Sequence, residues 1–470
     1  MEQINECPLR FQARRQPQQT AIKSDQLRLT FKQLDRHIDL LGKQLIEQGM
    51  TTGDRLACIA ANSINLILLQ LTCVRYGLIF CPINPRFSHP EIQSRLAILN
   101  TPFLYLAQTE AVLALPSLSL DFTLRSESEA TLPELKIDPL QVIDIIFTSG
   151  SSGQPKAVMH HFSNHFYSAL GAQEFIPLQA GDKNLLSLPL FHISGYATVM
   201  RTILAGATLI LSEQKLTIAL LEEQQITHLS LVCTQLYRLL AKSEFKQCNL
   251  PIKHLLLGGS AFPNRQLAET ARRGFNYHLS YGLTEMSSQV ATSSNSQSLV
   301  ILKYRELKIV ENEILLRGKT RFAGYFKDAV TTSLLPQEAW FASNDLGKNT
   351  ANIVQIMGRK DRLFISGGEN IQPEEIERLL LTFAAVKQAY IVAVDDPYFG
   401  KRPVAFIDWE HTPNTEELNH YLQKKLSRYK MPVHYFLLAP QSSIKVSLTQ
   451  LQAHAQRRVN KLRLSAGERP

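Results

Sequence analysis

Cysteine, long apolar runs and a leader segment are what this sequence has least of. Its 470 residues include six cysteines, none in a C-x-x-C pair, which favours buried thiols in a reducing compartment over a disulfide framework or a zinc site. The most apolar stretch, residues 64–74, is broken by Asn65, Gln70 and Thr72, so no span of about 18 apolar residues exists to cross a bilayer. The start, MEQINECPLRF, lacks the apolar core of a signal peptide. We therefore expect a cytoplasmic protein without integral membrane association.

No residue class dominates the composition, which has 44% apolar and 19% charged residues with 22 glycines and 22 prolines. These values exclude a disordered chain, a collagen and a coiled-coil rod. The net charge of +9 is spread along the chain and is accompanied by no nucleic-acid motif, so nucleic-acid binding is not expected. The densest basic cluster is interpreted as a solvated tail: Arg457, Arg458, Lys461 and Arg463.

Helical and strand patterns alternate along the first 260 residues. Apolar residues recur every three or four positions over residues 31–45, and Gly49 follows as a stop, which predicts an amphipathic helix. A buried helix is predicted over residues 64–76. Strands are predicted at residues 56–60, 79–83, 142–147, 184–188, 208–211, 228–232 and 254–257. This alternation predicts an α/β fold with mixed, largely parallel sheets flanked by helices.

The pattern changes after residue 306. Residues 307–310 and 314–317 flank Glu311-Asn312, which predicts a hairpin. Pro373 and the two glutamates after it open a helix, strands follow at residues 389–394 and 404–408, and Asn414 precedes another helix. At about 150 residues per domain, the length allows one large domain and a small one. We predict a large N-terminal domain, residues 1–358, and a small α+β C-terminal domain, residues 359–470.

The strongest local signal is TSGSSGQPK, residues 148–156, directly after a predicted strand. Its small residues leave backbone N–H groups free to surround phosphate oxygens, its hydroxyl side chains add donors, and Lys156 adds a positive charge. The pattern is not G-x-x-x-x-G-K-[ST], so this is no Walker loop. A flexible surface loop is the alternative on composition alone.

Further motifs follow in a fixed order. They are LLLGGSAFP at 255–263, YGLTE at 281–285, GYF at 324–326, Asp345 within WFASNDLG, GRKDRLFISGGENIQPEEIE at 358–377, RYKMP at 428–432, and Lys445. Together with the 148–156 loop, this set resembles the adenylate-forming superfamily of acyl-CoA synthetases, luciferase-like enzymes and peptide-synthetase adenylation domains, over nearly the whole chain. The resemblance implies the adenylate-forming fold, a mobile C-terminal domain, ATP and Mg²⁺ as cofactors, and CoA as a substrate.

The resemblance also implies residue roles. The 148–156 loop would hold the β- and γ-phosphates, Thr284 would contact the α-phosphate, and Glu285, which alone would more often be a surface acid, would hold Mg²⁺. Asp345 and Arg359 would bind the ribose, and Asp361 would be the hinge between the domains. The other implied nucleotide residues are Thr148, Ser149, Gly150, Ser151, Ser152, Gly153 and Lys156 for phosphates, and Gly258, Gly259, Ser260, Tyr281 and Gly282 for adenine.

These residue types suit the chemistry. A carboxylate must attack a phosphate that is already anionic, so the accumulating negative charge needs a cation, and Lys445 matches the lysine that bridges the two groups. In the second half-reaction the small domain would rotate and Lys445 would leave. Ser366, Gly367 and Gly368 would then line the CoA channel with room for a narrow pantetheine arm. A plain turn before the Pro373 helix is the alternative.

Within the superfamily the chain is most similar to the o-succinylbenzoate–CoA ligases of menaquinone synthesis. Three segments carry this likeness: PLFHISGYATVMR at 189–201, TQLYRLL at 234–240 and IKVS at 444–447. An arginine forks well onto a carboxylate, so Arg201 would suit a dicarboxylic acid, with a surface salt bridge as the alternative. His192 alone would more often be a packed core histidine. The expected acyl-pocket residues are His192, Ser194, Arg201 and Gly259.

Three departures put the local geometry in doubt. Ser343-Asn344-Asp345 stands where Thr-Gly-Asp is usual, Ile444 precedes the lysine in place of glycine, and Thr449 replaces an arginine.

Other functions stay open: a ligase for benzoate, a cinnamate or a short fatty acid; an adenylation enzyme that loads a carrier protein, although no carrier domain follows before Pro470; and a non-catalytic nucleotide-binding protein. Similar ligases are commonly homodimers, which leaves a homodimer open, but the sequence gives no interface and does not fix the oligomeric state.

Overall fold

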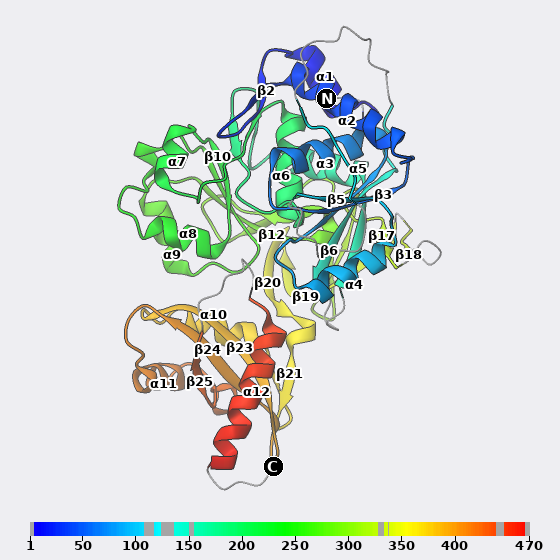
Figure 1. The fold of residues 1–470 in the computed structure, drawn as a ribbon. Helices are drawn as coiled ribbons and strands as arrows, with labels where there is room; N and C mark the ends of the chain where they lie inside the picture. The colour runs from blue at the N-terminus through cyan, green and yellow to red at the C-terminus, as the bar shows by residue number, and fades with distance from the viewer. Residues whose placement is uncertain are drawn as a thin grey trace. The chain divides into compact units, whose positions relative to one another are not determined.

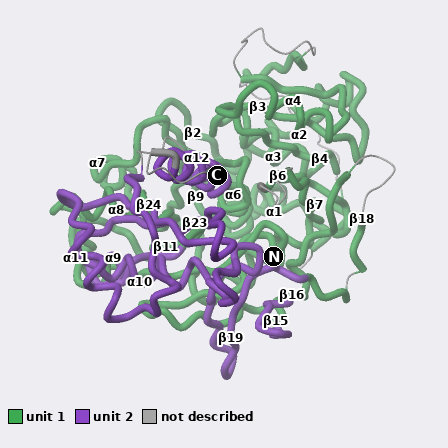
Figure 2. Tube along the Cα trace, turned by 90° about the horizontal axis from the view of Figure 1, so that it is seen from below, with its two compact units in different colours: residues 1–260, 270–307, 316–341 green, residues 261–269, 308–315, 342–470 purple. Residues whose placement is uncertain are grey.

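The computed structural model describes residues 4–107, 117–123, 136–149, 155–327, 333–336, 338–438 and 446–465. The chain divides into two compact units, coloured separately in Figure 2. The first comprises Met1–Ser260, Thr270–Leu307 and Leu316–Phe341, and the second comprises Ala261–Glu269, Lys308–Leu315 and Ala342–Pro470. The predicted boundary after residue 358 stays a prediction.

A seven-stranded sheet in the first unit has the order β18-β17-β7-β6-β4-β3-β5. Strands β5, β3, β4 and β6 run parallel, whereas β7, β17 and β18 continue the sheet antiparallel. Its strands are β3 (Arg55–Ile59), β4 (Ile79–Ile83), β5 (Leu104–Leu106), β6 (Val142–Ser149), β7 (Pro155–His161), β17 (Gly324–Phe326) and β18 (Ser333–Leu334).

The other strands of the first unit follow the order β14-β13-β12-β11-β10-β8-β9-β1-β2. The stretch from β12 to β1 is parallel, and the outer strands are antiparallel. These strands are β1 (Thr20–Lys23), β2 (Arg28–Thr30), β8 (Lys183–Leu185), β9 (Thr208–Ile210), β10 (His228–Leu231), β11 (His254–Leu257), β12 (Tyr277–Leu283), β13 (Ser288–Thr292) and β14 (Leu299–Ile301).

Helices cover both faces of the seven-stranded sheet. The helix α3 packs on β4 and β6, α5 packs on β7 and α6, and α4 packs on β3 (Figure 1). The helix α3 begins after Ser63, whose side chain accepts from the Leu66 N–H, and ends at Gly77 with φ +66°. The helices are α1 (Pro8–Arg15), α2 (Phe31–Glu47), α3 (Ile64–Tyr76), α4 (His89–Leu99), α5 (Phe162–Ala172), α6 (Ile193–Ala205), α7 (Ile218–Glu223), α8 (Cys233–Leu240) and α9 (Asn264–Arg272).

The second unit contains the antiparallel pair β19 (Phe341–Thr350) and β20 (Ile353–Arg359) and a three-stranded sheet, β23-β24-β25. The helix α12 lies along β23 (Figure 1), where Val392, Val404 and Phe406 pack with Leu451 and Val459 in one core cluster. Its remaining elements are β21 (Phe364–Ser366), β22 (Glu369–Ile371), α10 (Pro373–Leu380), β23 (Val386–Asp396), β24 (Gly400–Trp409), α11 (Thr415–Gln423), β25 (Tyr435–Leu437) and α12 (Leu448–Ser465).

The elements confirm the predicted α/β fold. The predicted hairpin is formed by β15 (Glu306–Val310) and β16 (Glu313–Arg317), with Glu311 and Asn312 at positive φ between them. The basic cluster is solvated as predicted for Arg457, Arg458 and Lys461, which are exposed, but it lies on the helix α12 rather than in a tail, and Arg463 pairs with Asp396. Five cysteines are buried as expected, and Cys248 is exposed. Within the described ranges, no helix has the length and apolarity of a membrane span.

Three histidines form a ladder across the parallel strands β10, β11 and β12. The ring centroids of His228 and His254 lie 5.1 Å apart, as do those of His254 and His278. His228 and His278 are buried, and His254 Nδ1 lies 2.9 Å from His278 Nε2. Burial is the main cause that lowers the pKa of His228 and of His278 to about 4. The ladder is therefore neutral in the folded state at pH 7.

We expect the ladder to make the first unit sensitive to acid. The unfolded histidines have a pKa of about 6.5, so the unfolded state binds more protons between pH 6.5 and 4, and stability falls as the pH falls through that window. The loss at pH 5 is on the order of 2 kcal/mol for each histidine. Urea unfolding midpoints at pH 7 and pH 5 measure it. His278→Gln should lose less on acidification, and an equal loss in that variant would contradict the assignment.

Candidate nucleotide and acyl site

The predicted phosphate loop joins two antiparallel strands of the first unit. Strands β6 and β7 pair so that Thr148 faces Lys156 and Ser149 faces Pro155. The Lys156 ammonium lies 5.4 Å from the centre of the Tyr325 ring. The hairpin thus brings the two ends of the loop together, as phosphate binding by one loop requires. Gly150, Ser151, Ser152 and Gly153 lie outside the described residues.

Two predicted adenine segments lie side by side on adjacent strands. Strand β11 ends at Leu257, which pairs with Leu279 of β12, so residues 258–260 emerge next to residues 280–282. A Cβ atom at Gly258 would lie 3.6 Å from the Ser280 carbonyl oxygen, and Gly259 has φ +86°. At Gly282 a Cβ atom would lie 1.9 Å from the Ser288 carbonyl oxygen, so no side chain fits there. The described residues therefore bring Gly258, Gly259, Ser260, Tyr281 and Gly282 to one edge of the sheet.

The turn after β12 carries Thr284 and Glu285. The 3₁₀ turn Thr284–Met286 follows β12 directly, and both residues are half-buried. The Tyr325 hydroxyl donates to Glu285 Oε1 at 2.8 Å, and the Phe322 N–H donates to the Glu285 carbonyl at 2.9 Å. Mg²⁺ takes oxygen ligands and is usually held by one or two carboxylates plus phosphate oxygens. A half-buried carboxylate beside a threonine hydroxyl fits such an ion.

The helix α6 carries the predicted acyl-pocket residues. His192 stands at its N-cap and is exposed, with its ring 4.8 Å from the Phe191 ring, so the reading as a packed core histidine is wrong. Ser194 lies in the first turn of the helix, and its carbonyl accepts from Thr198 Oγ1. The exposed N-terminus of α6 leaves His192 accessible to a small molecule.

Arg201 lies further along α6, and its hydrogen-bond partners among the described residues are neutral. Its Nη1 donates to Gln289 Oε1 at 3.2 Å and its Nη2 donates to Thr198 Oγ1 at 3.0 Å. Burial lowers the pKa of Arg201 to about 10. Among the residues that the structure describes, no carboxylate lies within ion-pair distance of it, so the reading as a surface salt bridge is wrong. A half-buried cation with no anionic partner among the described residues is suited to receive a carboxylate from a ligand.

Sequence reasoning missed a buried cluster beside the phosphate hairpin. Asp144 Oδ2 lies 2.7 Å from His160 Nδ1, and Asp144 Oδ1 lies 2.6 Å from His165 Nε2, with all three side chains inaccessible to solvent. Burial opposes ionisation of Asp144, but the two histidines outweigh it and lower its pKa to about 2. Burial likewise opposes the charged form of His160, yet Asp144 outweighs it and raises that pKa. The histidines within HHFSNH, directly after the loop, were the available signal.

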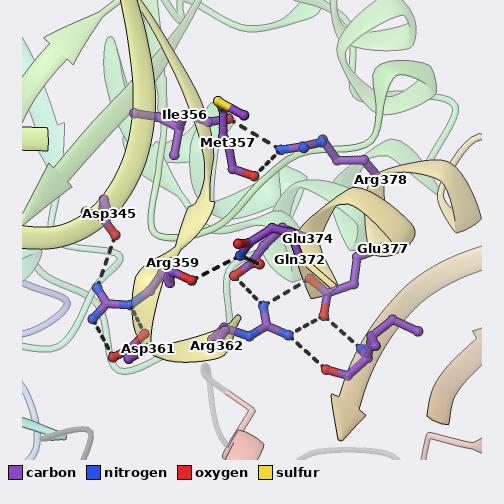
Figure 3. A network of polar contacts seen from close by, with 11 residues as sticks. Asp345, Ile356, Met357, Arg359, Asp361, Arg362, Gln372, Glu374, Glu377 and Arg378 are labelled. Carbon is purple, nitrogen blue, oxygen red and sulfur yellow. Dashed lines mark hydrogen bonds and ion pairs between the residues drawn. The ribbon is translucent and has the colours of Figure 1, made fainter. Parts of the chain in front are cut away.

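In the second unit, Arg359 joins the predicted ribose acid to the predicted hinge residue (Figure 3). Its Nη1 donates to Asp345 Oδ1 at 3.1 Å. Its Nε and Nη2 donate to the two oxygens of Asp361 at 2.9 and 2.8 Å. The hydrogen bond from Arg359 is the main cause that lowers the pKa of Asp361. The structure therefore brings Asp345, Arg359 and Asp361 into one network.

The segment after the predicted hinge is held by α10 (Figure 3). Arg362 pairs with Glu374 at 2.8 Å and with Glu377 at 2.6 Å. The Gln372 side chain donates to the Arg359 carbonyl at 3.0 Å, and Arg378 donates to the Met357 carbonyl at 2.9 Å. These contacts tie the residues on both sides of Asp361 to α10 and to Gln372 at its N-cap.

The structure explains the departure at Asn344. This residue has φ +60°, a conformation in which glycine is favoured and asparagine is the usual substitute. Its N–H donates to Glu313 Oε1 at 3.2 Å, and the next N–H, that of Asp345, donates to Ser343 Oγ at 3.0 Å. Asparagine thus reproduces the backbone that a glycine would supply before the ribose acid.

We expect Asn344→Gly to keep stability and activity, because glycine adopts this φ freely. Asn344→Val should lower stability by about 1–2 kcal/mol, because a β-branched residue is strained in the left-handed region. Thermal unfolding and ATP–pyrophosphate exchange of both variants measure this. Wild-type stability in Asn344→Val would show that the backbone there has no left-handed requirement.

The predicted CoA-channel residues form a tight hairpin. Gly367 and Gly368 join β21 to β22 with φ +57° and +85°. A Cβ atom at Gly367 would lie 2.9 Å from the Phe399 ring, whereas nothing lies within 4 Å of one at Gly368. Ser366 is buried. The turn geometry accounts for both glycines, so their role toward CoA stays a prediction.

The positions of the described residues do not test the roles predicted for the remaining residues. Lys445 and Ile444 lie outside the described residues. Thr449 lies in the first turn of α12 and is exposed.

Comparisons with known proteins show the family of this chain. The AMP-binding enzyme family matches residues 9–326, and the AMP-binding enzyme C-terminal domain matches residues 375–443. The 2-succinylbenzoate–CoA ligase of Escherichia coli K12 is 33% identical over 460 residues, which cover 93% of this chain and 95% of that protein.

Two solved structures are similar over almost their whole length. A variant of E. coli MenE with bound OSB-AMS has a TM-score of 0.84 and 31% identity, covering 96% of this chain and 98% of that one. The o-succinylbenzoate CoA synthetase (MenE) of Bacillus subtilis in complex with the acyl-adenylate intermediate OSB-AMP has a TM-score of 0.83 and 26% identity, covering 95% and 98%. This chain therefore belongs to the AMP-binding enzyme family and, within it, to the 2-succinylbenzoate–CoA ligases.

Proposed function

We propose that this chain is an acid–thiol ligase that joins 2-succinylbenzoate to CoA with the conversion of ATP to AMP and pyrophosphate. In the first step a carboxylate oxygen of the acid bonds to the α-phosphorus, and the bond from that phosphorus to pyrophosphate breaks. In the second step the CoA sulfur bonds to the acyl carbon, AMP leaves, and the thiol proton passes to solvent. The products are an acyl-CoA, AMP and pyrophosphate.

The observation that carries the choice of acid is Arg201. Its guanidinium is half-buried, and among the described residues it donates to an amide oxygen and a threonine hydroxyl and to no carboxylate. A monocarboxylic acid uses its single carboxylate in the reaction and leaves this half-buried cation without an anionic partner, which is unfavourable once the ligand excludes water. A second carboxylate accepts two parallel hydrogen bonds from the guanidinium fork. A dicarboxylic aromatic acid therefore suits this helix better than benzoate or a fatty acid. His192, Ser194 and Gly259 complete the proposed acyl pocket.

The first unit supplies the groups proposed to act on the phosphates. Thr148 and Lys156 stand at the two ends of the phosphate loop, and Lys156 adds a positive charge where the pyrophosphate leaves. Thr284 is proposed to donate its hydroxyl to the α-phosphate. Glu285, oriented by the Tyr325 hydroxyl, is the residue proposed to hold Mg²⁺, which when bound neutralises charge on the phosphate oxygens.

The second unit supplies the groups proposed for the ribose and for CoA. Asp345 can accept hydrogen bonds from two ribose hydroxyls, and Arg359 holds its carboxylate in place. Asp361 is proposed as the hinge residue, with the predicted domains meeting near it. Ser366, Gly367 and Gly368 are proposed to border the thiol path, and Lys445 to bridge the carboxylate and the α-phosphate. A homodimer and a cytoplasmic location are further proposals, the first of which light scattering measures.

The test is a direct assay of substrate choice. The purified chain is incubated with ATP, Mg²⁺ and CoA, and with 2-succinylbenzoate, benzoate, 4-coumarate or octanoate in parallel, and AMP and acyl-CoA are measured by mass. Product with 2-succinylbenzoate alone is the expected result. Product with another acid would keep the chemistry and overturn the choice of acid. No AMP with any acid would overturn the catalytic assignment.

A further inference from the structure

Asp144 and His160 lie on the hairpin that carries the phosphate loop. They face each other across β6 and β7, four residue pairs from the Thr148–Lys156 pair at the loop end. Both side chains are inaccessible to solvent, and Asp144 Oδ2 lies 2.7 Å from His160 Nδ1. A buried ionic pair of this kind is weak evidence for stability, because well-packed apolar residues often replace one without loss. A contribution to stability is therefore not a sufficient reason for this buried pair.

The second ring nitrogen of His160 reaches the turn that carries Glu285. His160 Nε2 lies 2.7 Å from the Thr284 carbonyl oxygen. A carbonyl oxygen only accepts hydrogen bonds, so His160 donates there, and the carboxylate of Asp144 accepts at the other nitrogen. The chain Asp144–His160–Thr284 thus links the phosphate hairpin to the proposed metal turn through two short hydrogen bonds.

That turn needs to be held. Ser287 and Ser288 have φ +53° and +105°, both unfavourable for residues other than glycine. Backbone strain of this kind persists only where surrounding contacts enforce it. The Thr284 carbonyl accepts from His160 and from the Ser287 N–H, at 2.7 and 3.0 Å. Ser168 Oγ donates to the Ser287 carbonyl at 2.7 Å.

We propose that the Asp144–His160 pair positions the Thr284–Glu285 turn for Mg²⁺ and the α-phosphate, so that His160 is a positioning residue of the adenylation step. This inference rests on the proposed function. The His160 side chain is inaccessible to solvent and would act through the Thr284 carbonyl. A second link, from Lys156 over the Tyr325 ring to Glu285 Oε1, joins the same hairpin to the same turn. The two links together connect the described strands β6 and β7 to the turn that carries Glu285.

A metal ion at this cluster is the other reading of the same side chains. Asp144, His160 and His165 each offer one ligand atom, all within 4.8 Å of one another. Two ligands of a tetrahedral ion with bonds of 2.0–2.1 Å lie about 3.3 Å apart. The oxygen–nitrogen distances here are 2.7 and 2.6 Å, which are hydrogen-bond distances. The cluster is therefore hydrogen-bonded rather than arranged around an ion.

Two leucine variants separate positioning from stability. His160→Leu removes the hydrogen bond to Thr284. His165→Leu makes the same change on the same carboxylate, but His165 has no contact with the turn among its described partners. We expect His160→Leu to raise the KM for Mg²⁺·ATP and to lower the adenylation rate, each at least tenfold, with the KM for 2-succinylbenzoate within twofold. His165→Leu should leave both KM values within twofold while lowering the unfolding temperature. Equal effects of the two variants on the KM for ATP would overturn the proposal.

Two amide substitutions, His160→Gln and Asp144→Asn, test the same hydrogen bonds in case the leucine variant does not fold. His160→Gln keeps a donor for Thr284 but turns an acceptor toward Asp144, so ATP binding should weaken. Adding Asp144→Asn supplies a donor to that acceptor and rebuilds an uncharged chain of hydrogen bonds, so binding should recover to within threefold of wild type. No recovery in the double variant would overturn the proposal.

Calorimetric titration with ATP, with Mg²⁺ and with EDTA, gives a readout besides turnover. The gain in ATP affinity from Mg²⁺ should shrink at least fivefold in His160→Leu and stay within twofold in His165→Leu. This measurement is informative even if the wild-type chain activates no acid, a result that would remove the proposed function alone. An undiminished Mg²⁺ effect in His160→Leu would remove the positioning role alone.

Discussion

Arg201→Ala is expected to raise the KM for 2-succinylbenzoate about a hundredfold, which corresponds to about 2.7 kcal/mol of lost binding. The KM for ATP should change less than twofold. The physical reason is the environment of the guanidinium, which is desolvated and has neutral partners in Gln289 and Thr198. A ligand carboxylate would gain a charge-assisted pair there without displacing an existing ion pair. Steady-state kinetics with each substrate varied in turn measure both constants.

Arg201→Lys is the matched control, because it keeps the positive charge but lacks the planar guanidinium with its parallel N–H donors. We expect an intermediate KM for the acid, since a lysine cannot hold a carboxylate with two parallel hydrogen bonds. Analogues of 2-succinylbenzoate that lack one carboxylate, 4-oxo-4-phenylbutyrate and 2-butanoylbenzoate, extend the test. The analogue that is still turned over identifies the activated carboxylate, and its KM should be indifferent to Arg201→Ala. Equal effects of Arg201→Ala on acid and ATP would remove Arg201 from the acyl pocket.

Lys445→Ala is expected to lower the rate of adenylate formation about a thousandfold. The attacking carboxylate and the α-phosphate are both anionic, and a preorganised cation at their meeting point is worth about 10²–10³ in rate, with more where the site excludes water. Thioester formation from preformed acyl-AMP should stay within about threefold of wild type, because no pentacovalent phosphate forms in that step. ATP–pyrophosphate exchange measures the first step, and acyl-CoA release from synthetic acyl-AMP measures the second.

Lys461→Ala serves as the control for charge. Lys461 lies on α12 and is exposed, so its removal lowers the net charge by the same amount. Both half-reactions should be unaffected in that variant. Adenylation that survives in Lys445→Ala would mean that another cation bridges the carboxylate and the phosphate.

Local chemistry made much of the fold predictable. The helix over residues 64–76 and the strands at 79–83 and 254–257 were predicted with the bounds that the structure has, because each is a strongly apolar run closed by a glycine or a polar residue. The hairpin at Glu311-Asn312 followed from turn residues that tolerate positive φ. The basic C-terminal cluster is exposed as its charge suggested, but the helix that carries it was not predicted, and Leu451, Ala455 and Val459 bury the other side of that helix.

Other features depend on segments distant in sequence. The hydrogen bond between His160 and Thr284 joins residues 124 positions apart, and no local pattern marks which carbonyl a buried histidine will contact. Arg201 could have been a surface ion pair until the structure placed it among neutral groups. Asn344 was a departure of unknown consequence until its φ of +60° showed a conformation that asparagine tolerates.

The sequence by itself determined the elements and the family, because apolar periodicity, turn residues and the ordered motifs are local properties of the chain. Only the tertiary structure decided which charges are desolvated and which are paired. Burial and electrostatic partners arise when distant segments pack, and these set the ionisation of Asp144 and His160 and leave Arg201 with neutral partners alone.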